Sequence, residues 1–166
     1  MKKIIVLTLL LGLLQGCLGS QSYTETDLEK AVLAIKETFQ EDYYPQAEIS
    51  EEMLEHVYGI DLSRIDAYFA EGPLFTMSVD TLIILIAKDG YVDELKEALL
   101  DYQNYLIHES FQYPMNMPKV NASKVFVQHN LVAFIMLGAY TDDFEDDTHY
   151  ENESQRAIEA LKSALK

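Results

Sequence analysis

The chain has 166 residues, which is enough for one domain with a substantial hydrophobic core. Its 28 Asp and Glu residues outnumber 12 Lys and Arg residues, and the formal net charge is −16. Phosphate backbones repel such a surface, and no basic stripe with interleaved aromatic residues offsets the repulsion, so nucleic acid is excluded as a partner. The single cysteine, Cys17, excludes intramolecular disulfides, a CxxC redox centre and a multi-cysteine zinc site.

The first 16 residues have the order of a secretory signal peptide. Lys2 and Lys3 precede an apolar run over residues 4–14. That run is too short to cross a bilayer, which takes about 20 apolar residues. A buried helix is the alternative interpretation, but the basic head and the small residue that follows the run favour export.

The sequence Leu14-Gln15-Gly16-Cys17 resembles the lipobox of bacterial lipoproteins. In that motif the cysteine thiol receives a diacylglyceryl group, and a signal peptidase cuts just before the cysteine, here between Gly16 and Cys17. Gln15 departs from the small or β-branched residue usual at its position. The resemblance implies a chain that is held by lipid on Cys17 at the extracytoplasmic face of the cell membrane.

The expected organisation is a signal peptide over residues 1–16, a lipidated tether over 17–25 and a single domain over 26–166. More than one acyl chain would anchor such a protein stably, because each buried methylene adds about 0.8 kcal/mol. Anionic headgroups repel the acidic surface, so the lipid would supply the affinity for the membrane.

The N-terminal half of this domain is predicted to be helical. Thr26 and Glu29 have the spacing of a capping box before an amphipathic helix that Pro45 ends. A second, short helix is expected after Ser50. Residues 60–73 are interpreted as a helical turn that packs on the core and is closed by glycine and proline.

The C-terminal half alternates strands and helices. Residues 81–87 are continuously apolar and rich in β-branching, which predicts a strand covered on both faces or placed at the centre of a sheet. Residues 92–106 have apolar residues at spacings of three and four, which predicts a helix, and residues 113–118 are predicted to form a loop with two prolines. Residues 120–127 and 131–139 are predicted to form a hairpin.

Residues 142–153 are acidic and have the length of a calcium-binding loop. Phe144 stands at the third position, which needs an oxygen ligand, and Asp147 replaces the required glycine. We therefore expect a solvated acidic loop rather than a dedicated calcium site, and weak, nonspecific cation binding by the loop stays an open alternative. Ile158, Leu161 and Leu165 predict a closing helix.

The order strand, helix, strand, strand, helix predicts an α+β fold. We expect a small three-stranded antiparallel sheet, ferredoxin-like without the last strand, with its first strand central and its helices on one face. The N-terminal helices would pack beside this unit.

No pattern points to catalysis or to a cofactor. The four histidines are too scattered to bind a metal through a local motif, and carboxylates are too common for any pair to be distinctive. Tyr43 and Tyr102 fit the core. Tyr113, Met115, Asn116 and Met117 lie between or beside two prolines and are the candidate partner-binding loop.

An ordered set of short segments also resembles a known family. These segments are Gly59-Ile60-Asp61, Val79-Asp80-Thr81, Lys88-Asp89-Gly90-Tyr91-Val92, the helix around Lys96 and Leu99, Gln112-Tyr113-Pro114-Met115-Asn116 and Lys124-Val125. The set is similar to a family of small lipoproteins of Gram-positive bacteria described as a domain of unknown function (four-three-five-eight). The resemblance implies a secreted or surface lipoprotein and assigns no catalytic residue.

The resulting hypothesis is a noncatalytic binding or accessory domain at the cell envelope. Its partners would be the membrane, through the lipid on Cys17, and an envelope protein or cell-wall partner, through the sheet or the Tyr113 loop. The alternative is an envelope hydrolase that uses carboxylates from distant segments. About 150 mature residues leave no room for the two closing lobes of a solute-binding transport protein.

Overall fold

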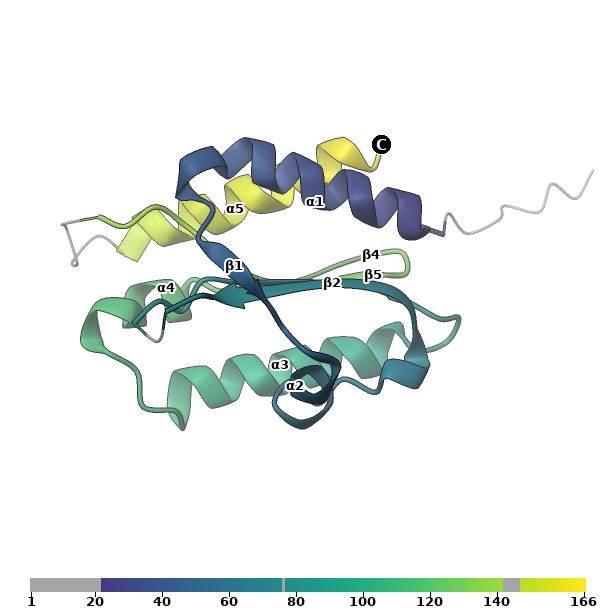
Figure 1. Ribbon diagram of the computed structural model, residues 1–166, viewed down its shortest axis with the longest axis horizontal. Helices are drawn as coiled ribbons and strands as arrows, with labels where there is room; N and C mark the ends of the chain where they lie inside the picture. Colours follow the sequence, from purple (N-terminus) through teal and green to yellow (C-terminus); the bar gives the residue numbers. More distant parts are fainter. Residues whose placement is uncertain (1–21, 76, 142–146) are drawn as a thin grey trace, which may run out of the picture.

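The structure, a computed structural model, describes residues 22–75, 77–141 and 147–166 (Figure 1). The predicted signal peptide, the cleavage between Gly16 and Cys17 and the lipidation of Cys17 lie outside the described residues. Within the described part of the chain, none of the helices is both long enough and apolar enough to cross a membrane.

Among the described residues, five α-helices and five strands form the domain. In chain order they are α1 (Glu25–Phe39), β1 (Pro45–Glu48), α2 (Glu51–His56), β2 (Ile65–Pro73), β3 (Thr81–Ala87), α3 (Val92–His108), α4 (Met117–Asn121), β4 (Lys124–Gln128), β5 (Leu131–Met136) and α5 (Asp147–Ala164). Single turns of 3₁₀-helix, η1 (Gln40–Asp42), η2 (Leu62–Arg64) and η3 (Pro114–Asn116), follow α1 and precede β2 and α4.

Strand β3 is the centre of a five-stranded antiparallel sheet with the order β1-β2-β3-β5-β4. All seven of its residues are buried. A strand that is paired on both edges and covered on both faces can be apolar at every position, because neither face meets water. The predicted central strand over residues 81–87 is therefore confirmed.

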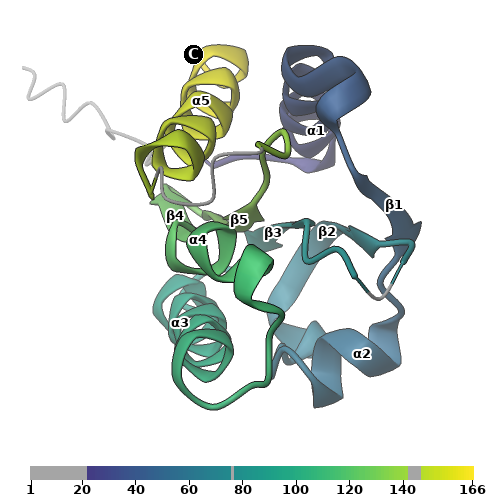
Figure 2. The ribbon, with the colours of Figure 1, turned by 90° about the vertical axis from the view of Figure 1, so that its left-hand side faces the viewer.

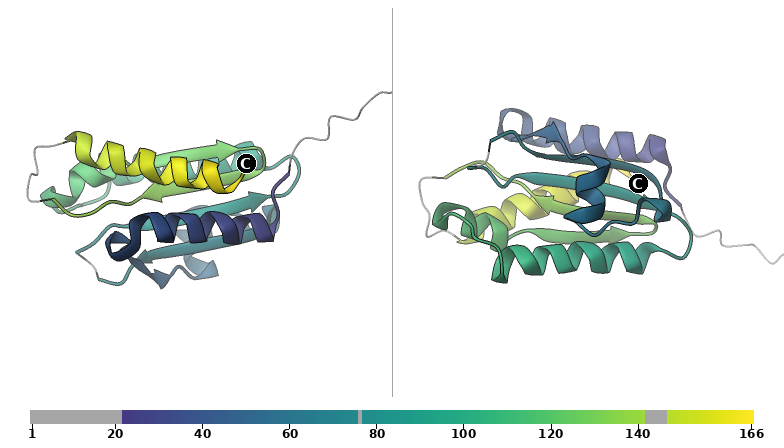
Figure 3. Two further views of the ribbon diagram at one scale, coloured as in Figure 1. Left: turned by 90° about the horizontal axis from the view of Figure 1, so that it is seen from above. Right: turned by 60° about the horizontal axis from the view of Figure 1, so that its bottom comes forward.

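Helices cover both faces of the sheet, so the domain has three layers (Figure 2). Leu82, Ile84 and Ile86 of β3 belong to the cluster packed by α1 and α5, which lie side by side (Figure 3). Ile83 and Leu85 point to the other face, where they pack with residues of α2, α3 and α4. The alternation of side chains along β3 thus supplies two separate cores.

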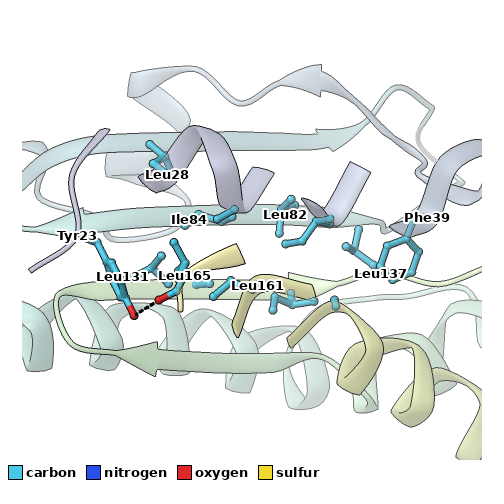
Figure 4. Close-up of a cluster of buried hydrophobic side chains, with 14 of the residues drawn as sticks. Tyr23, Leu28, Phe39, Leu82, Ile84, Leu131, Leu137, Leu161 and Leu165 are labelled. Atoms are coloured by element: carbon cyan, nitrogen blue, oxygen red, sulfur yellow. Dashed lines mark hydrogen bonds between the residues drawn. The ribbon is translucent and has the colours of Figure 1, made fainter. Parts of the chain in front are cut away.

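Figure 4 shows the core beneath α1 and α5. Leu28 and Phe39 come from α1, Leu161 from α5, and Leu82 from the sheet. Segments from both ends of the chain close this face, so the N-terminal and C-terminal helices depend on each other for burial.

The expectation of a three-stranded sheet with helices on one face is wrong. Residues 65–73 form β2 rather than a helical turn, and β2 pairs with β3 along the edge that a ferredoxin-like plan gives to its last strand. Phe69 packs into one core and Tyr68 into the other, so both faces of β2 are apolar and the strand lacks the usual polar alternation. Strand β1 has only four residues, too few for a recognisable pattern.

The unit from β3 to β5 agrees with the predicted order except for α4, because residues 117–121, predicted as the end of a loop and the start of a strand, form a short helix before β4. Helix α3 follows β3, and β4 and β5 form the predicted hairpin, in which His129 has a positive φ of 52°. Strand β5 inserts between β3 and β4 and is antiparallel to both. The predicted short helix after Ser50 is also confirmed: Ser50 is the N-cap of α2, and its side chain accepts a hydrogen bond from the Met53 N–H.

Two helix starts differ from the prediction. Helix α1 is capped by Thr24 and Asp27 rather than Thr26 and Glu29: the Thr24 N–H donates to Asp27 Oδ2 over 3.1 Å. Residues 142–146 of the predicted acidic loop lie outside the described residues, and α5 already begins at Asp147.

The central position of β3 makes a stability prediction. Replacing Ile84, which is fully buried, by alanine should lower the free energy of unfolding by about 2–5 kcal/mol, because the deletion removes apolar contacts and leaves a cavity. The matched change Leu33→Ala, at a side chain 58% exposed, should change it by less than about 0.5 kcal/mol. Urea denaturation measures both, and equal losses would contradict the three-layer core.

Candidate binding site

The two ends of the sheet differ in the segments of the chain that meet there. At one end, which we call the hairpin end, β3 finishes and the β4–β5 turn lies beside it. At the other, the loop end, β1 and β3 begin, β2 and β5 finish, and α4 packs nearby (Figure 1). Loops that are far apart in the sequence therefore meet at the loop end, where candidate binding residues from different segments come together.

A buried ion pair between Lys119 and Asp80 lies at the loop end. The Lys119 side chain is 1% exposed and the Asp80 side chain is fully buried. Lys119 Nζ donates to Asp80 Oδ1 over 2.9 Å, to Asp80 Oδ2 over 2.8 Å and to the Gly138 carbonyl oxygen over 2.9 Å. These acceptors match the three donors of an ammonium group, so Lys119 serves as a structural cation rather than as a nucleophile.

The three partners come from three segments. Lys119 lies in α4, Asp80 immediately precedes β3, and Gly138 follows β5. Gly138 has a φ of +149°, and a Cβ there would lie 3.0 Å from the Tyr150 ring, so only glycine fits. Ser78 adds a further contact, since its hydroxyl donates to Asp80 Oδ2 over 2.8 Å. The pair therefore fixes α4 and two strand ends relative to one another.

Three tyrosine rings surround the ammonium group. Its nitrogen lies 4.0 Å from the ring centre of Tyr140, 5.2 Å from that of Tyr150 and 5.8 Å from that of Tyr44. The negative ring faces favour a cation, most strongly where water is excluded. Burial lowers the pKa of Lys119, and the adjacent Asp80 carboxylate opposes that shift. Burial also raises the pKa of each of the three tyrosines.

An apolar groove lies outside this pair. We call it the loop-end groove; its volume is about 410 Å³ and it is lined by Tyr44, Gln46, Leu74, Phe75, Met77, Ser78, Met115 and Tyr140. Tyr44 and Tyr140 belong to both the groove and the ring cluster around Lys119. The ion pair therefore orders two of the groove's aromatic walls.

The walls of the loop-end groove are exposed although they are apolar. Phe75 is 72% exposed, and Leu74, Met77, Met115 and Tyr140 are also exposed. Gathered apolar side chains of this kind mark interaction sites more often than single ones do. The lining therefore offers mainly apolar contact, as most small-molecule and peptide pockets do.

The predicted partner-binding loop divides into two parts. Met115 lines the groove and Tyr113 is exposed nearby in the chain, whereas Asn116 is buried. The Asn116 amide donates to the Met77 carbonyl oxygen over 3.0 Å, which ties this loop to the β2–β3 connection. Met117 is half-buried and begins α4. Asn116 thus positions the groove rather than presenting itself to a partner.

Sequence reasoning missed the other groove residues. Leu74 and Phe75 directly follow Pro73 in a connection between strands, and an apolar pair at such a place was the available signal. No local pattern distinguishes Lys119 from a surface lysine, because its partner Asp80 is 39 residues away in the chain.

The histidines stay apart. His56, His108 and His129 are exposed, and His149 lies within 2.8 Å of the Ala139 carbonyl oxygen. Within the ranges that the structure describes, no group of three or more His, Cys, Asp or Glu residues is arranged to hold a metal ion.

Fold and groove together define a class of protein: a three-layer α+β domain with an apolar groove at one end of its sheet. A protein-family model described as "Domain of unknown function (DUF4358)" matches residues 39–137, more than half of the chain. The chain belongs to this family. The matched region contains Asp80, Lys119 and all the lining of the loop-end groove except Tyr140. Among curated proteins and among solved structures, nothing matches the chain.

The ion pair makes a second stability prediction. Lys119→Met should lower the free energy of unfolding by about 3–5 kcal/mol, because it leaves the buried Asp80 carboxylate without a counter-charge. The double variant Asp80→Asn with Lys119→Met should lose less than Lys119→Met alone, since no charge is then buried. The surface control Lys30→Met, which breaks an exposed pair with Asp27, should cost less than about 1 kcal/mol. Equal losses at Lys30 and Lys119 in denaturant titrations would refute the assignment.

Proposed function

We propose that the protein is a noncatalytic binding domain of the cell envelope, anchored by lipid on Cys17 at the extracytoplasmic face of the membrane. The loop-end groove binds an apolar segment of an envelope protein. The observation that carries this proposal is the exposure of Phe75 and its apolar neighbours around one groove of an otherwise strongly acidic protein.

The contacts between the segments that carry the groove support a binding role. A preformed site loses less conformational entropy on association than a flexible one. The Asp80–Lys119 pair and the bond from Asn116 to Met77 hold the segments that carry the groove walls. Phe75 and Met115 can therefore present their side chains without being ordered by the partner.

The position of the N-terminal segment supports an outward-facing groove. Tyr23 is attached to the hairpin end: its N–H donates to Asn130 Oδ1 over 2.6 Å, and its hydroxyl accepts from Gln128 Nε2 over 2.6 Å. Its hydroxyl also donates to the Leu165 carbonyl oxygen over 3.4 Å (Figure 4). The chain from Cys17 to Ser22 spans at most about 18 Å. A lipid on Cys17 therefore keeps the hairpin end near the membrane and the groove away from it.

The hydrolase alternative stays a prediction. It requires carboxylates that converge in a concave site, and the described lining of the loop-end groove contains none. The carboxyl groups of Asp27 and Asp61 have pKa values lowered by hydrogen bonds, chiefly from Lys30 and Ser63 respectively. A general acid needs a shift in the opposite direction.

Site-specific photo-crosslinking in intact cells tests the proposal. A photo-reactive phenylalanine analogue at Phe75 should give one reproducible crosslinked protein, whereas the analogue at Leu33, which is also exposed but lies on α1, should not. Adding Met115→Ser should reduce the Phe75 product about tenfold, corresponding to about 1.4 kcal/mol of lost apolar contact.

Cell fractionation of Cys17→Ala supplies the second readout. The variant should leave the membrane fraction, because the thiol that accepts the lipid is gone. Retention in the membrane would overturn the anchor, and equal crosslinking from positions 75 and 33 would overturn the groove as the binding surface.

A further inference from the structure

A second groove lies on another side of the molecule, between α3 and the residues that directly follow α2. These helices cover the sheet face opposite to α1 and α5 (Figure 2). The groove has a volume of about 470 Å³, and we call it the α2–α3 groove. Tyr58 and Tyr102 lie in it with their ring centres 4.3 Å apart, and the half-exposed side chains of Val57 and Tyr105 also line it.

The fold leaves this groove open because α2 is short. Helix α2 ends at His56, and Gly59, with a φ of +69°, turns the chain back toward the sheet. Helix α3 is 17 residues long, so the short α2 lies beside only a small part of it. There Gly59 approaches Ala98, where a Cβ on the glycine would lie 3.9 Å from that of the alanine.

One wall of the α2–α3 groove is acidic. Glu94, Glu97 and Asp101 line it from α3 at positions i, i+3 and i+7, which share one helix face. At 1.5 Å per residue, the steps between them are about 4.5 and 6 Å along the helix. Arg64 lies 3.5 Å from Glu94 and Lys96 lies 3.9 Å from Glu97, but these carboxylates remain more than half exposed. Such surface pairs are weak and exchange readily with a partner's cations.

We propose that the α2–α3 groove binds a cationic amphipathic polypeptide segment. Its apolar side chains contact Val57 and Tyr105 above the Tyr58–Tyr102 pair, and its Lys or Arg side chains face the carboxylates of α3. From Glu94 to Tyr105 the wall is about 16 Å long, which matches about three turns of helix in the partner. The net charge of −16 attracts a cationic segment over longer distances as well.

The negative charge of the groove favours a cationic polypeptide over two other occupants, an anionic bilayer and a second copy of the chain. An anionic bilayer is repelled by the acidic wall, and a second copy would bring two acidic walls together. A cationic polypeptide satisfies both the apolar floor and the acidic wall. This inference is independent of the lipid anchor and of the loop-end groove.

Fluorescence anisotropy with a designed probe tests the inference on the full chain. The probe is a labelled helical peptide of about 12 residues, with leucines on one face and lysines spaced i, i+3 and i+7 beside them. A peptide of the same composition in scrambled order is the control probe. The patterned peptide should bind saturably and at least about tenfold more tightly than the scrambled one.

Matched variants locate the site. Neutralising the acidic wall with Glu94→Gln, Glu97→Gln and Asp101→Asn should weaken the patterned peptide at least about tenfold, and so should Val57→Ser with Tyr105→Ser. The control triple Glu29→Gln, Glu37→Gln and Glu151→Gln, at exposed sites on α1 and α5, makes the same change in net charge and should weaken it less than about twofold.

Three results would overturn the inference: no preference for the patterned peptide, equal losses for the two acidic triples, or loss only in Phe75→Ser, which alters the loop-end groove. Binding of vesicles of phosphatidylcholine and phosphatidylglycerol that depends on Val57 and Tyr105 would instead identify a membrane surface. Dimerisation that depends on them in sedimentation would identify a second copy. Circular dichroism confirms that each variant is folded.

Discussion

The Asp80 carboxylate sits without access to water at the start of the central strand, and Lys119 neutralises it. A charge in such a place is tolerated only when it is paired and hydrogen-bonded, so α4 must deliver Lys119 to the first residue before β3. This requirement also sets the end of β5, because the Gly138 carbonyl oxygen accepts the third hydrogen bond of the ammonium group.

The loop-end groove is built directly on this ion pair. The rings of Tyr44 and Tyr140 contact the ammonium group on one side and line the groove on the other. The connection from β2 to β3, which carries Phe75, ends at Asp80 and is tied to the loop before α4 through Asn116. The walls of the loop-end groove are therefore connected directly to the buried ion pair. The α2–α3 groove depends on a different feature, the brevity of α2, so the two surfaces can act separately.

Much of the fold follows from patterns in the chain. The apolar run of β3, the rhythm of α3, the β4–β5 hairpin and the Ser50 cap each have a local cause and were predictable. Strands β1 and β2 were missed, because the first is very short and the second is apolar on both faces. Without these two strands, the predicted sheet had three strands, and the predicted helices covered only one of its faces.

The candidate site was predictable only where it is local. Two prolines marked the loop that contains Met115, one wall of the groove. Phe75 and Lys119 could not be recognised, because their roles arise from contacts with segments far away in the sequence. The prediction for Cys17 depends on residues outside those that the structure describes.

The central claim is that the Asp80–Lys119 pair orders the loop end of the sheet. Hydrogen–deuterium exchange of the double variant Asp80→Asn with Lys119→Met, compared with the natural sequence, tests it most directly. The account predicts faster exchange in residues 113–123 and 137–141 while β3 and β5 stay protected. Unchanged exchange in those two segments would contradict it, because the groove would then be held by something other than the ion pair.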